Sequence, residues 1–208
     1  MGTFTRLRVR GYRRLLDIDM ELRPLTVMIG ANSVGKSSIL EIFDLLAATA
    51  AGNLNAKLSD SGGLAALLTI GKSRALELCV CLPSGRHESF EYRLSIEPRG
   101  TAYAVASEDL TRLQPEPVTF IESRYSSIRY FDTREKRLIS PTWGHDELET
   151  SLAQVPKTYV EAEEFRRHLA SSTLYHVLTV DPKAPVRLPQ PMRPAKLPGA
   201  NGENLVSC

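Results

Sequence analysis

The chain opens with two stretches in which apolar and charged residues alternate. Over residues 5–10 every second position is an arginine, which predicts a strand with one buried face and one basic face. Residues 16–23 alternate in the same way, with mostly acidic residues at the polar positions. Residues 11–15 form a turn, so we predict a hairpin in which charges of opposite sign share the solvent face. The basic positions are Arg6, Arg8 and Arg10, and the acidic ones are Asp17, Asp19 and Glu21.

A buried strand and an amphipathic helix are predicted next. Residues 25–29 carry no charge, which is typical of a buried strand, and Pro24 marks its beginning. The residues after position 36 have apolar side chains at spacings of three and four, which predicts a helix packed on the sheet. Its predicted apolar face consists of Ile39, Leu40, Phe43, Leu46, Ala47 and Ala50.

The remainder of the chain is predicted to be rich in strands. Residues 51–63 are small and polar, which favours a loop, and residues 64–70 favour a short helix. Short strand-like runs divided by Pro, Gly and Ser then predict an antiparallel meander. A helix is predicted over 159–170, where glutamates precede arginines in the order that suits the helix dipole. From residue 181 the prolines predict an extended segment. The strand-like runs are 76–82, 90–96, 102–106, 118–122 and 128–131.

Composition narrows the class of protein only slightly. The 208 residues carry a net charge of +2, so any nucleic-acid partner has to be argued from a local patch. Three cysteines, Cys79, Cys81 and Cys208, show no metal-binding spacing, and the first two are expected to be packed free thiols. No stretch has the length of a signal peptide or a membrane span, so we expect a cytoplasmic protein without membrane contact.

The strongest chemical signal lies between the predicted strand at 25–29 and the following helix. It has the phosphate-loop pattern of glycine, four residues, glycine, lysine and serine. The glycines let the backbone wrap around a phosphate, so that N–H groups and the helix N-terminus face the anion. The candidate nucleotide-binding residues are Gly30, Ala31, Asn32, Ser33, Val34, Gly35, Lys36, Ser37 and Ser38. Lys36 is expected to reach the outer phosphates, and the Ser37 hydroxyl is the candidate Mg²⁺ ligand.

Gly11-Tyr12-Arg13-Arg14 follows the first predicted strand, an amphipathic second strand comes next, and GANSVGKSSIL follows. In these features the first fifty residues resemble the amino-terminal lobe of ABC-type ATPases of the SMC, RecF and OLD kind, and most of all bacterial AAA-type ATPases. Ser33 stands where a glycine is common in this family. The resemblance implies a P-loop NTPase of the α/β class, an incomplete ABC-ATPase-like head lobe with a mixed sheet and an antiparallel β meander. It also implies that Arg13 or Arg14 lies near the nucleotide.

We expect one incomplete head domain over residues 1–208. Residues 1–52 would hold the hairpin, the loop and the first helix, residues 53–158 a β-rich part, and residues 159–208 a helix and the proline-rich segment. The resemblance implies ATP and Mg²⁺ as ligands and an ATP-dependent homodimer of the intact protein. A second protein or a nuclease subunit is a further partner that it leaves open. The task that the resemblance implies is DNA repair or anti-phage defence.

Hydrolysis in this family also needs a signature motif, an acidic Walker B pair and a histidine. Ser61-Gly62-Gly63 matches a fragment of the signature, but it follows the first helix instead of preceding a Walker B strand. Val177 to Asp181 has the apolar run and final carboxylate of a Walker B strand, but Pro182 occupies the position of the catalytic glutamate. Val118 to Glu122 is a similar candidate, but no signature motif precedes it. Gln114 and Gln190 are weak candidates for the glutamine that senses Mg²⁺. The catalytic residues therefore stay unknown, and the histidines form no zinc pattern.

Three functions remain open from the sequence. The first is the nucleotide-binding lobe of an ATPase whose catalytic half lies elsewhere. The second is a module in which nucleotide gates dimerisation or partner docking without turnover. The third is a nucleic-acid-binding domain that uses the face of Arg6, Arg8 and Arg10, for which salt-sensitive binding without nucleotide is expected.

Overall fold

A computed structural model of the chain describes residues 3–84 and 88–172. The chain divides into two compact units, residues 1–171 and 172–208. Eight strands described in the first unit form one sheet in the order β2-β1-β3-β4-β5-β6-β7-β8. They are β1 (Arg6–Tyr12), β2 (Leu15–Glu21), β3 (Leu76–Ser84), β4 (Glu88–Arg99), β5 (Ala102–Gln114), β6 (Val118–Arg124), β7 (Ser127–Asp132) and β8 (Arg137–Ile139).

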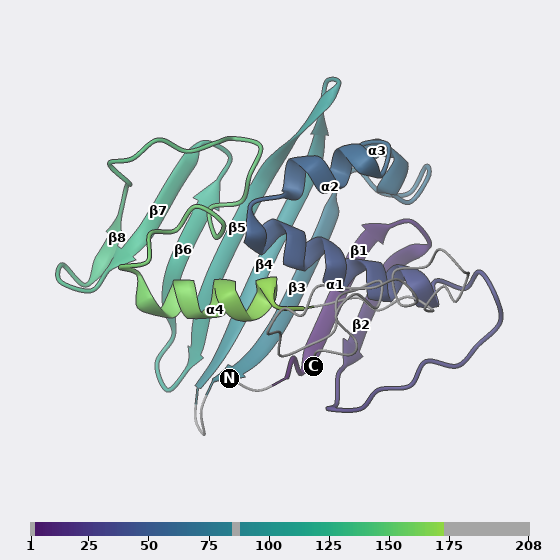
Figure 1. Ribbon diagram of the computed structural model, residues 1–208, viewed down its shortest axis with the longest axis horizontal. Helices are drawn as coiled ribbons and strands as arrows, with labels where there is room; N and C mark the ends of the chain where they lie inside the picture. The colour runs from purple at the N-terminus through teal and green to yellow at the C-terminus, as the bar shows by residue number, and fades with distance from the viewer. Residues whose placement is uncertain (1–2, 85–87, 173–208) are drawn as a thin grey trace, which may run out of the picture. The chain divides into compact units, whose positions relative to one another are not determined.

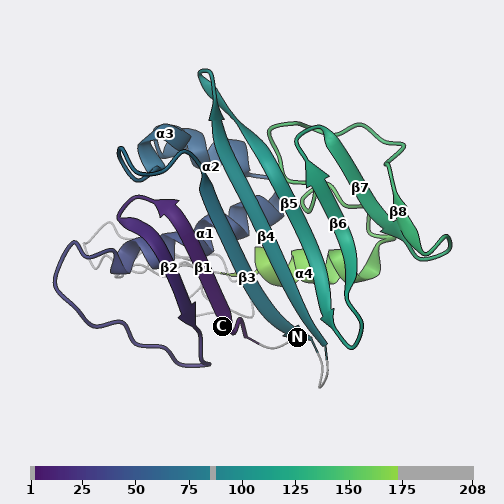
Figure 2. The ribbon, with the colours of Figure 1, turned by 180° about the vertical axis from the view of Figure 1, so that it is seen from behind.

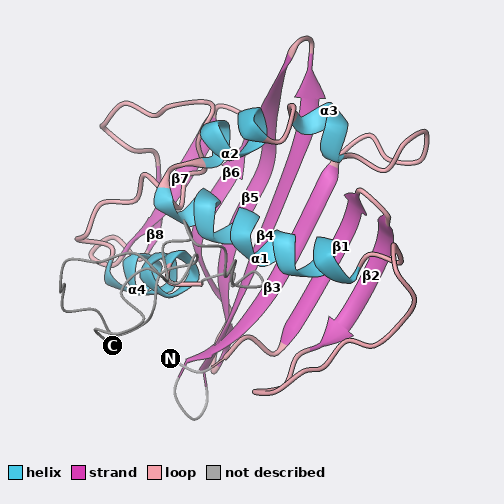
Figure 3. Ribbon diagram, turned by 45° about the vertical axis from the view of Figure 1, so that its right-hand side comes forward, coloured by secondary structure: helices cyan, strands magenta, loops and turns pink. Residues whose placement is uncertain are grey.

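The helices of this unit lie on one face of the sheet. α1 crosses the strands and α4 runs beside it, while the short α2 and α3 lie toward one end (Figures 1 and 3). The opposite face of the sheet carries no described helix (Figure 2). The described helices are α1 (Lys36–Ala51), α2 (Leu54–Asp60), α3 (Leu64–Leu67) and α4 (Val160–Ala170). None of them is long and apolar enough to cross a membrane.

The core fills the space between these helices and the sheet. Leu7 and Val9 of β1 are fully buried on this face, as the alternation predicts. Phe165 of α4 packs its ring 5.6 Å from that of Tyr92 and 6.1 Å from that of Phe90, both on β4. Each aromatic ring buries a large apolar area, so this cluster joins α4 to the centre of the meander.

The hairpin, the meander and the α4 helix confirm the sequence predictions. β1 and β2 pair antiparallel, with Arg8 opposite Asp19 and Arg10 opposite Asp17. From β3 to β8 each strand pairs with the next in antiparallel register, in the simple order of a meander. The strands at 76–82, 90–96, 102–106, 118–122 and 128–131 all exist, and the third is longer than predicted because β5 continues to Gln114.

The strand predicted at residues 25–29 is wrong for the described structure. These residues form no strand, and the side chains of Leu25, Val27 and Ile29 are 82%, 71% and 94% exposed. A buried strand needs a hydrogen-bonding neighbour and a covered face, and no described strand lies beside this segment. The predicted mixed sheet is also wrong for the described residues, because every described strand pair is antiparallel.

Two local predictions around α1 also need correction. The loop predicted over 51–63 contains α2, because Leu54 and Leu58 bury their side chains at helical spacing. The carboxylate of Glu149, far along the chain, accepts hydrogen bonds from the N–H groups of Leu54 and Asn55 and so caps this helix.

The buried face of α1 is also rotated from the predicted one. The helix is buried at Ser38, Ile42, Leu45, Leu46, Ala47, Thr49 and Ala50, while Leu40 is exposed and Ile39 and Phe43 are partly buried. The orientation of the helix over the sheet, which the periodicity does not contain, selects the face.

Candidate phosphate-binding site

The loop before α1 has the backbone conformation that its glycines allow. Gly35 immediately precedes the helix with φ +109°, a value that L side chains rarely adopt, and a Cβ there would lie 2.8 Å from Cδ2 of Leu15. Ser33, which replaces the usual glycine of the family, adopts φ +65°. A serine tolerates this left-handed conformation at a modest cost, so the replacement leaves the turn intact.

The N–H groups of the loop are available to a ligand. Among residues 3–84 and 88–172, no group accepts a hydrogen bond from the backbone N–H of any residue from 31 to 38. The first turn of α1 contains no acidic residue, and no side chain caps it. An unsatisfied run of N–H groups at the positive end of a 16-residue helix favours an anion.

Lys36 lies over this loop. Its Nζ donates hydrogen bonds to the carbonyl oxygens of Gly30 and Ala31, at 2.7 and 2.6 Å. The ammonium group therefore lies above the same turn whose N–H groups are unpaired. Because these acceptors are neutral and the site is exposed, a phosphate oxygen is a better partner for the lysine.

A cavity of about 480 Å³ adjoins the loop and brings distant residues together. Arg13 and Arg14, from the turn between β1 and β2, line it beside the phosphate loop. Its described lining includes three cationic side chains and no carboxylate, which makes the cavity electropositive. The lining residues are Arg13, Arg14, Asn32, Ser33, Gly35, Lys36, Ser37, Ser38, Ala66, Leu68 and Ile70. Gly30, Ala31 and Val34 belong to the loop but do not line this cavity.

A carboxylate on α1 holds Arg13. The Arg13 Nε lies 3.2 Å from Oε2 of Glu41, and the same oxygen accepts a hydrogen bond from the Tyr12 hydroxyl at 3.1 Å. Burial and the Glu41 charge together raise the pKa of Tyr12 to about 12, so this phenol remains a donor at neutral pH. Arg13 is thus positioned at the rim of the cavity by a tether that a phosphate would compete with.

Ser37 offers a hydroxyl at the first turn of α1, where it is exposed and hydrogen-bonded to no other described residue. A single hydroxyl beside bound phosphate oxygens and water fits Mg²⁺, which keeps several waters and takes few protein ligands. The donor set therefore fits a nucleotide with its metal, although the described cavity lining holds no second acidic ligand.

The sequence did not reveal the residues of the α3 region that line the cavity. Leu68 forms an isolated bridge with Tyr12, and the Arg13 N–H donates to the carbonyl of Leu67 at 2.6 Å. These contacts bring Ala66, Leu68 and Ile70 beside the arginine turn. No sequence signal marked them, since the prediction for this region was only a short helix over residues 64–70.

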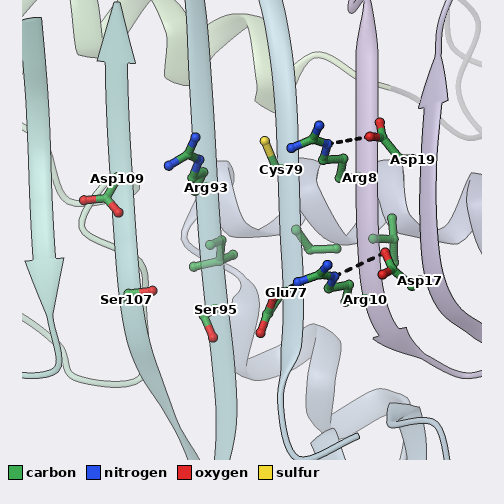
Figure 4. Close-up of a pocket in the computed structure, with 13 residues that line it drawn as sticks. Arg8, Arg10, Asp17, Asp19, Glu77, Cys79, Arg93, Ser95, Ser107 and Asp109 are labelled. Atoms are coloured by element: carbon green, nitrogen blue, oxygen red, sulfur yellow. Dashed lines mark hydrogen bonds and ion pairs between the residues drawn. The ribbon is translucent and has the colours of Figure 1, made fainter.

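The basic face of the hairpin is neutralised by its own neighbours (Figure 4). Arg6 and Arg8 each lie 2.7 Å from Oδ2 of Asp19. Arg10 pairs with Asp17 at 3.2 Å and lies 3.7 Å from Glu77. A cavity of about 760 Å³ on this face has both signs of charge in its lining. This arrangement weakens the nucleic-acid alternative, because each guanidinium group already has a carboxylate partner with which a nucleic-acid phosphate would have to compete.

The other candidates do not join the loop. Gly62 and Gly63 lie in the turn between α2 and α3, both with positive φ, as a plain glycine turn requires. Glu122 faces Arg129 at 2.8 Å and lines a different cavity, and Gln114 ends β5. Residues 177–181, Gln190 and the proline-rich segment lie outside the described residues, as do His87 and His176.

Comparison with known proteins gives one family match and two partial similarities. A family model described as an AAA ATPase domain matches residues 4–196. An OLD nuclease of Thermus scotoductus is 49% identical over 41 residues, which are 20% of this chain and 8% of that protein. A chain from a structural study titled "Structural biochemistry of ATP-driven dimerization and DNA stimulated activation of SMC ATPases" is similar with a TM-score of 0.40 and 17% identity, over 56% of this chain and 72% of that one.

Proposed function

The chain belongs to the AAA ATPase domain family, and on this premise we propose that it binds ATP together with Mg²⁺ at the phosphate loop. The observation that carries the proposal is the run of unpaired N–H groups over residues 31–38, with the Lys36 ammonium above it. The β- and γ-phosphates would take the place of the Gly30 and Ala31 carbonyls as partners of Lys36. Ser37 would hold Mg²⁺, which neutralises phosphate charge when bound.

The test is calorimetric titration of the purified chain with ATP and with ADP in the presence of Mg²⁺. Lys36→Ala removes one charge-assisted contact and is expected to weaken binding by about 1.5 to 3 kcal/mol. Lys157→Ala is the matched control, because Lys157 is an exposed lysine outside the cavity lining. Equal affinity of wild type and Lys36→Ala would refute the site.

We propose further that hydrolysis belongs to the intact protein and that these 208 residues alone turn over ATP very slowly. Phosphoryl transfer requires a second acidic metal ligand and an oriented water, and the described cavity lining contains no carboxylate. Each missing group typically costs a hundredfold or more in rate. Phosphate release is measured with Lys36→Ala as the control for contaminating ATPase. A Lys36-dependent rate of about 1 s⁻¹ would contradict this.

A second candidate is a module in which nucleotide gates dimerisation or partner docking. It is favoured by the exposed apolar side chains of Leu25, Val27 and Ile29, which lead directly into the phosphate loop. A ligand that orders this loop would reposition them. Light scattering with and without Mg²⁺ and ATP separates the two candidates: nucleotide-dependent assembly of Lys36-intact protein without turnover supports the gating role.

The wider task is also proposed rather than established. We place the intact protein in DNA repair or anti-phage defence, a proposal prompted by the similarity of 41 residues to an OLD nuclease. The chain spans only a small part of that protein, so a nuclease partner or domain is part of the proposal. Comparing phage resistance of cells that carry the intact gene or its Lys36→Ala form tests it.

A further inference from the structure

Two cysteines and a glutamate meet on the sheet face that carries no described helix. Cys79 and Cys81 are two residues apart on β3, so both side chains point to this face. Glu91 lies directly opposite Cys81 on β4. The two Sγ atoms and a carboxylate oxygen of Glu91 all lie within 4.8 Å of one another, and all three residues are half-buried. Thiol sulfur and carboxylate oxygen are both metal ligands.

An ion pair orients the carboxylate toward the sulfur atoms. Oε1 of Glu91 lies 2.5 Å from Nη2 of Arg93, which is opposite Cys79 in the sheet register. The second oxygen, Oε2, faces the Sγ of Cys81 at 4.0 Å. Arg93 thus holds one oxygen and leaves the other directed at the thiols. Residues that hold a metal ligand in place in this way raise metal affinity about tenfold to a hundredfold.

The arginines of β1 border the same cluster. Arg6 lies opposite Cys81 and Arg8 opposite Cys79 in the sheet, and Figure 4 shows Arg8 next to the Cys79 sulfur. The hydrogen bond between the two thiols lowers the pKa of Cys81, with smaller contributions from Arg6 and Arg8, and it raises the pKa of Cys79 together with burial. Both guanidinium groups are ion-paired with Asp19, so their donors are engaged and their charge is partly offset.

A disulfide within the pair is the competing outcome. At a rise of about 3.4 Å per residue, the two Cα atoms of Cys79 and Cys81 are separated by about 6.8 Å, the upper limit for a disulfide. Their side chains also leave the strand in parallel directions. In a tetrahedral zinc site with Zn–S bonds of about 2.3 Å, two sulfur ligands lie about 3.8 Å apart. Small rotations of χ1 suffice to reach this spacing.

We propose that Cys79, Cys81 and Glu91 form a site for one thiophilic divalent cation, Zn²⁺, with a fourth position open to water or an external ligand. The site joins β3 to β4 and lies on the face of the sheet opposite α1. It is independent of the nucleotide-binding proposal. Metal binding releases the thiol protons and stabilises the folded chain, because the three ligands adopt this arrangement only when the strands are paired.

The experiment is a titration of the reduced full chain with Co²⁺ and then Zn²⁺, in the absence of nucleotide. Thiolate-to-cobalt charge-transfer absorption and tetrahedral Co²⁺ bands are expected, and Zn²⁺ should abolish them at one ion per chain. Cys79→Ser and Cys81→Ser should each lower the affinity about a hundredfold or more, and Arg93→Gln about tenfold. Cys208→Ser is the matched control that removes the third thiol. Lys36→Ala should bind Zn²⁺ as wild type does.

Zn²⁺ should also raise the midpoint of thermal unfolding of wild type and of Cys208→Ser, but not of the two serine variants at the site. Glu91→Gln keeps both cysteines and the side-chain shape, so it tests the site without depending on a cysteine variant. Three outcomes overturn the proposal: no cobalt–thiolate absorption, binding lost with Cys208→Ser, or binding unchanged in both Cys79→Ser and Cys81→Ser. Rapid loss of both thiols to a Cys79–Cys81 disulfide in air, with no metal uptake, would favour the competing outcome.

Discussion

The backbone N–H groups of the phosphate loop lack acceptors in the described part of the protein, whereas those of the buried turn near residue 151 have one. Over residues 31–38, most of which are exposed, the backbone N–H groups have no acceptor among the described residues. At Ser151 and Leu152 the N–H groups are buried, and the carboxylate of Glu108 accepts from both, at 2.5 and 2.9 Å. The same oxygen that accepts from Leu152 also accepts from the Tyr92 hydroxyl at 2.9 Å.

The difference follows from access to water. A buried N–H without a partner costs about 1 to 3 kcal/mol. In the turn at residue 151, the carboxylate of Glu108 accepts these hydrogen bonds and removes that cost. An exposed N–H bonds to water at little cost, and a phosphate can later replace that water. At these two places, the donors that a ligand can reach have no acceptor in the described protein, and the donors that it cannot reach are satisfied by a side chain of the chain itself.

The largest expected effect comes from removing the buried acceptor. Glu108→Ala leaves two buried N–H groups and the Tyr92 hydroxyl unpaired and should lower the free energy of unfolding by about 3 to 5 kcal/mol. Urea unfolding measures this. The matched control is Asp109→Asn on the same strand, where a surface ion pair with Arg124 is lost and the expected cost is about 1 kcal/mol or less. Equal costs for the two variants would show that the buried carboxylate does not hold this turn.

The phosphate loop should be most sensitive at its strained glycine. Gly35→Ala places a Cβ at φ +109° and 2.8 Å from Cδ2 of Leu15, so we expect the free energy of unfolding to fall by about 1 to 3 kcal/mol. Gly144→Ala is the control, because no atom lies within 4 Å of a Cβ added there. Nucleotide affinity should fall with Gly35→Ala and stay unchanged with Gly144→Ala. If Gly35→Ala has the stability and the nucleotide affinity of wild type, the loop adjusts to the added Cβ without a measurable cost.

Arg13 should contribute to nucleotide affinity without contributing to stability. Arg13→Ala removes one cation from the cavity lining, and about a tenfold loss of ATP affinity is expected, which is about 1.4 kcal/mol. Calorimetry measures it, with the exposed Arg99→Ala as the control. Glu41→Gln releases the arginine from its tether and should keep or increase the affinity. If Arg13→Ala and Arg99→Ala bind ATP equally well, Arg13 does not reach the ligand.

The smallest expected effect concerns the outer face of the hairpin. The hydrogen bond from the Arg6 guanidinium, supported by Arg8, lowers the pKa of Asp19 to about 2. Because the folded pKa is depressed, the contribution of Asp19 to stability is present above its unfolded pKa of about 3.9 and is lost as the pH falls toward 2. Arg6→Gln should raise the pKa of Asp19 toward the ordinary value, as NMR titration of its carboxyl carbon would show. Arg10→Gln, which removes a partner of Asp17 and Glu77, should leave the pKa of Asp19 unchanged.

The sequence alone determined the local elements and the chemistry of the loop. Alternation predicted β1 and β2 and a shared face of opposite charges, because side chains in a strand alternate between faces whatever the strand packs on. The strand-like runs predicted the meander, since short breaks between strands favour antiparallel neighbours. The glycine and lysine spacing predicted the phosphate loop, because backbone conformation and charge there are properties of a few adjacent residues.

Tertiary structure alone decided which residues meet. The uncharged residues 25–29 read as a buried strand, yet their burial depends on neighbours that no described strand supplies. Helix α2 appeared in a predicted loop because Glu149, almost a hundred positions later, caps it. Glu108 is buried only because the turn at residue 151 returns to it, and Glu91 reaches the two cysteines only through the register of β3 and β4. Contacts between residues far apart in sequence depend on the packing of the whole sheet, and no local pattern encodes that packing.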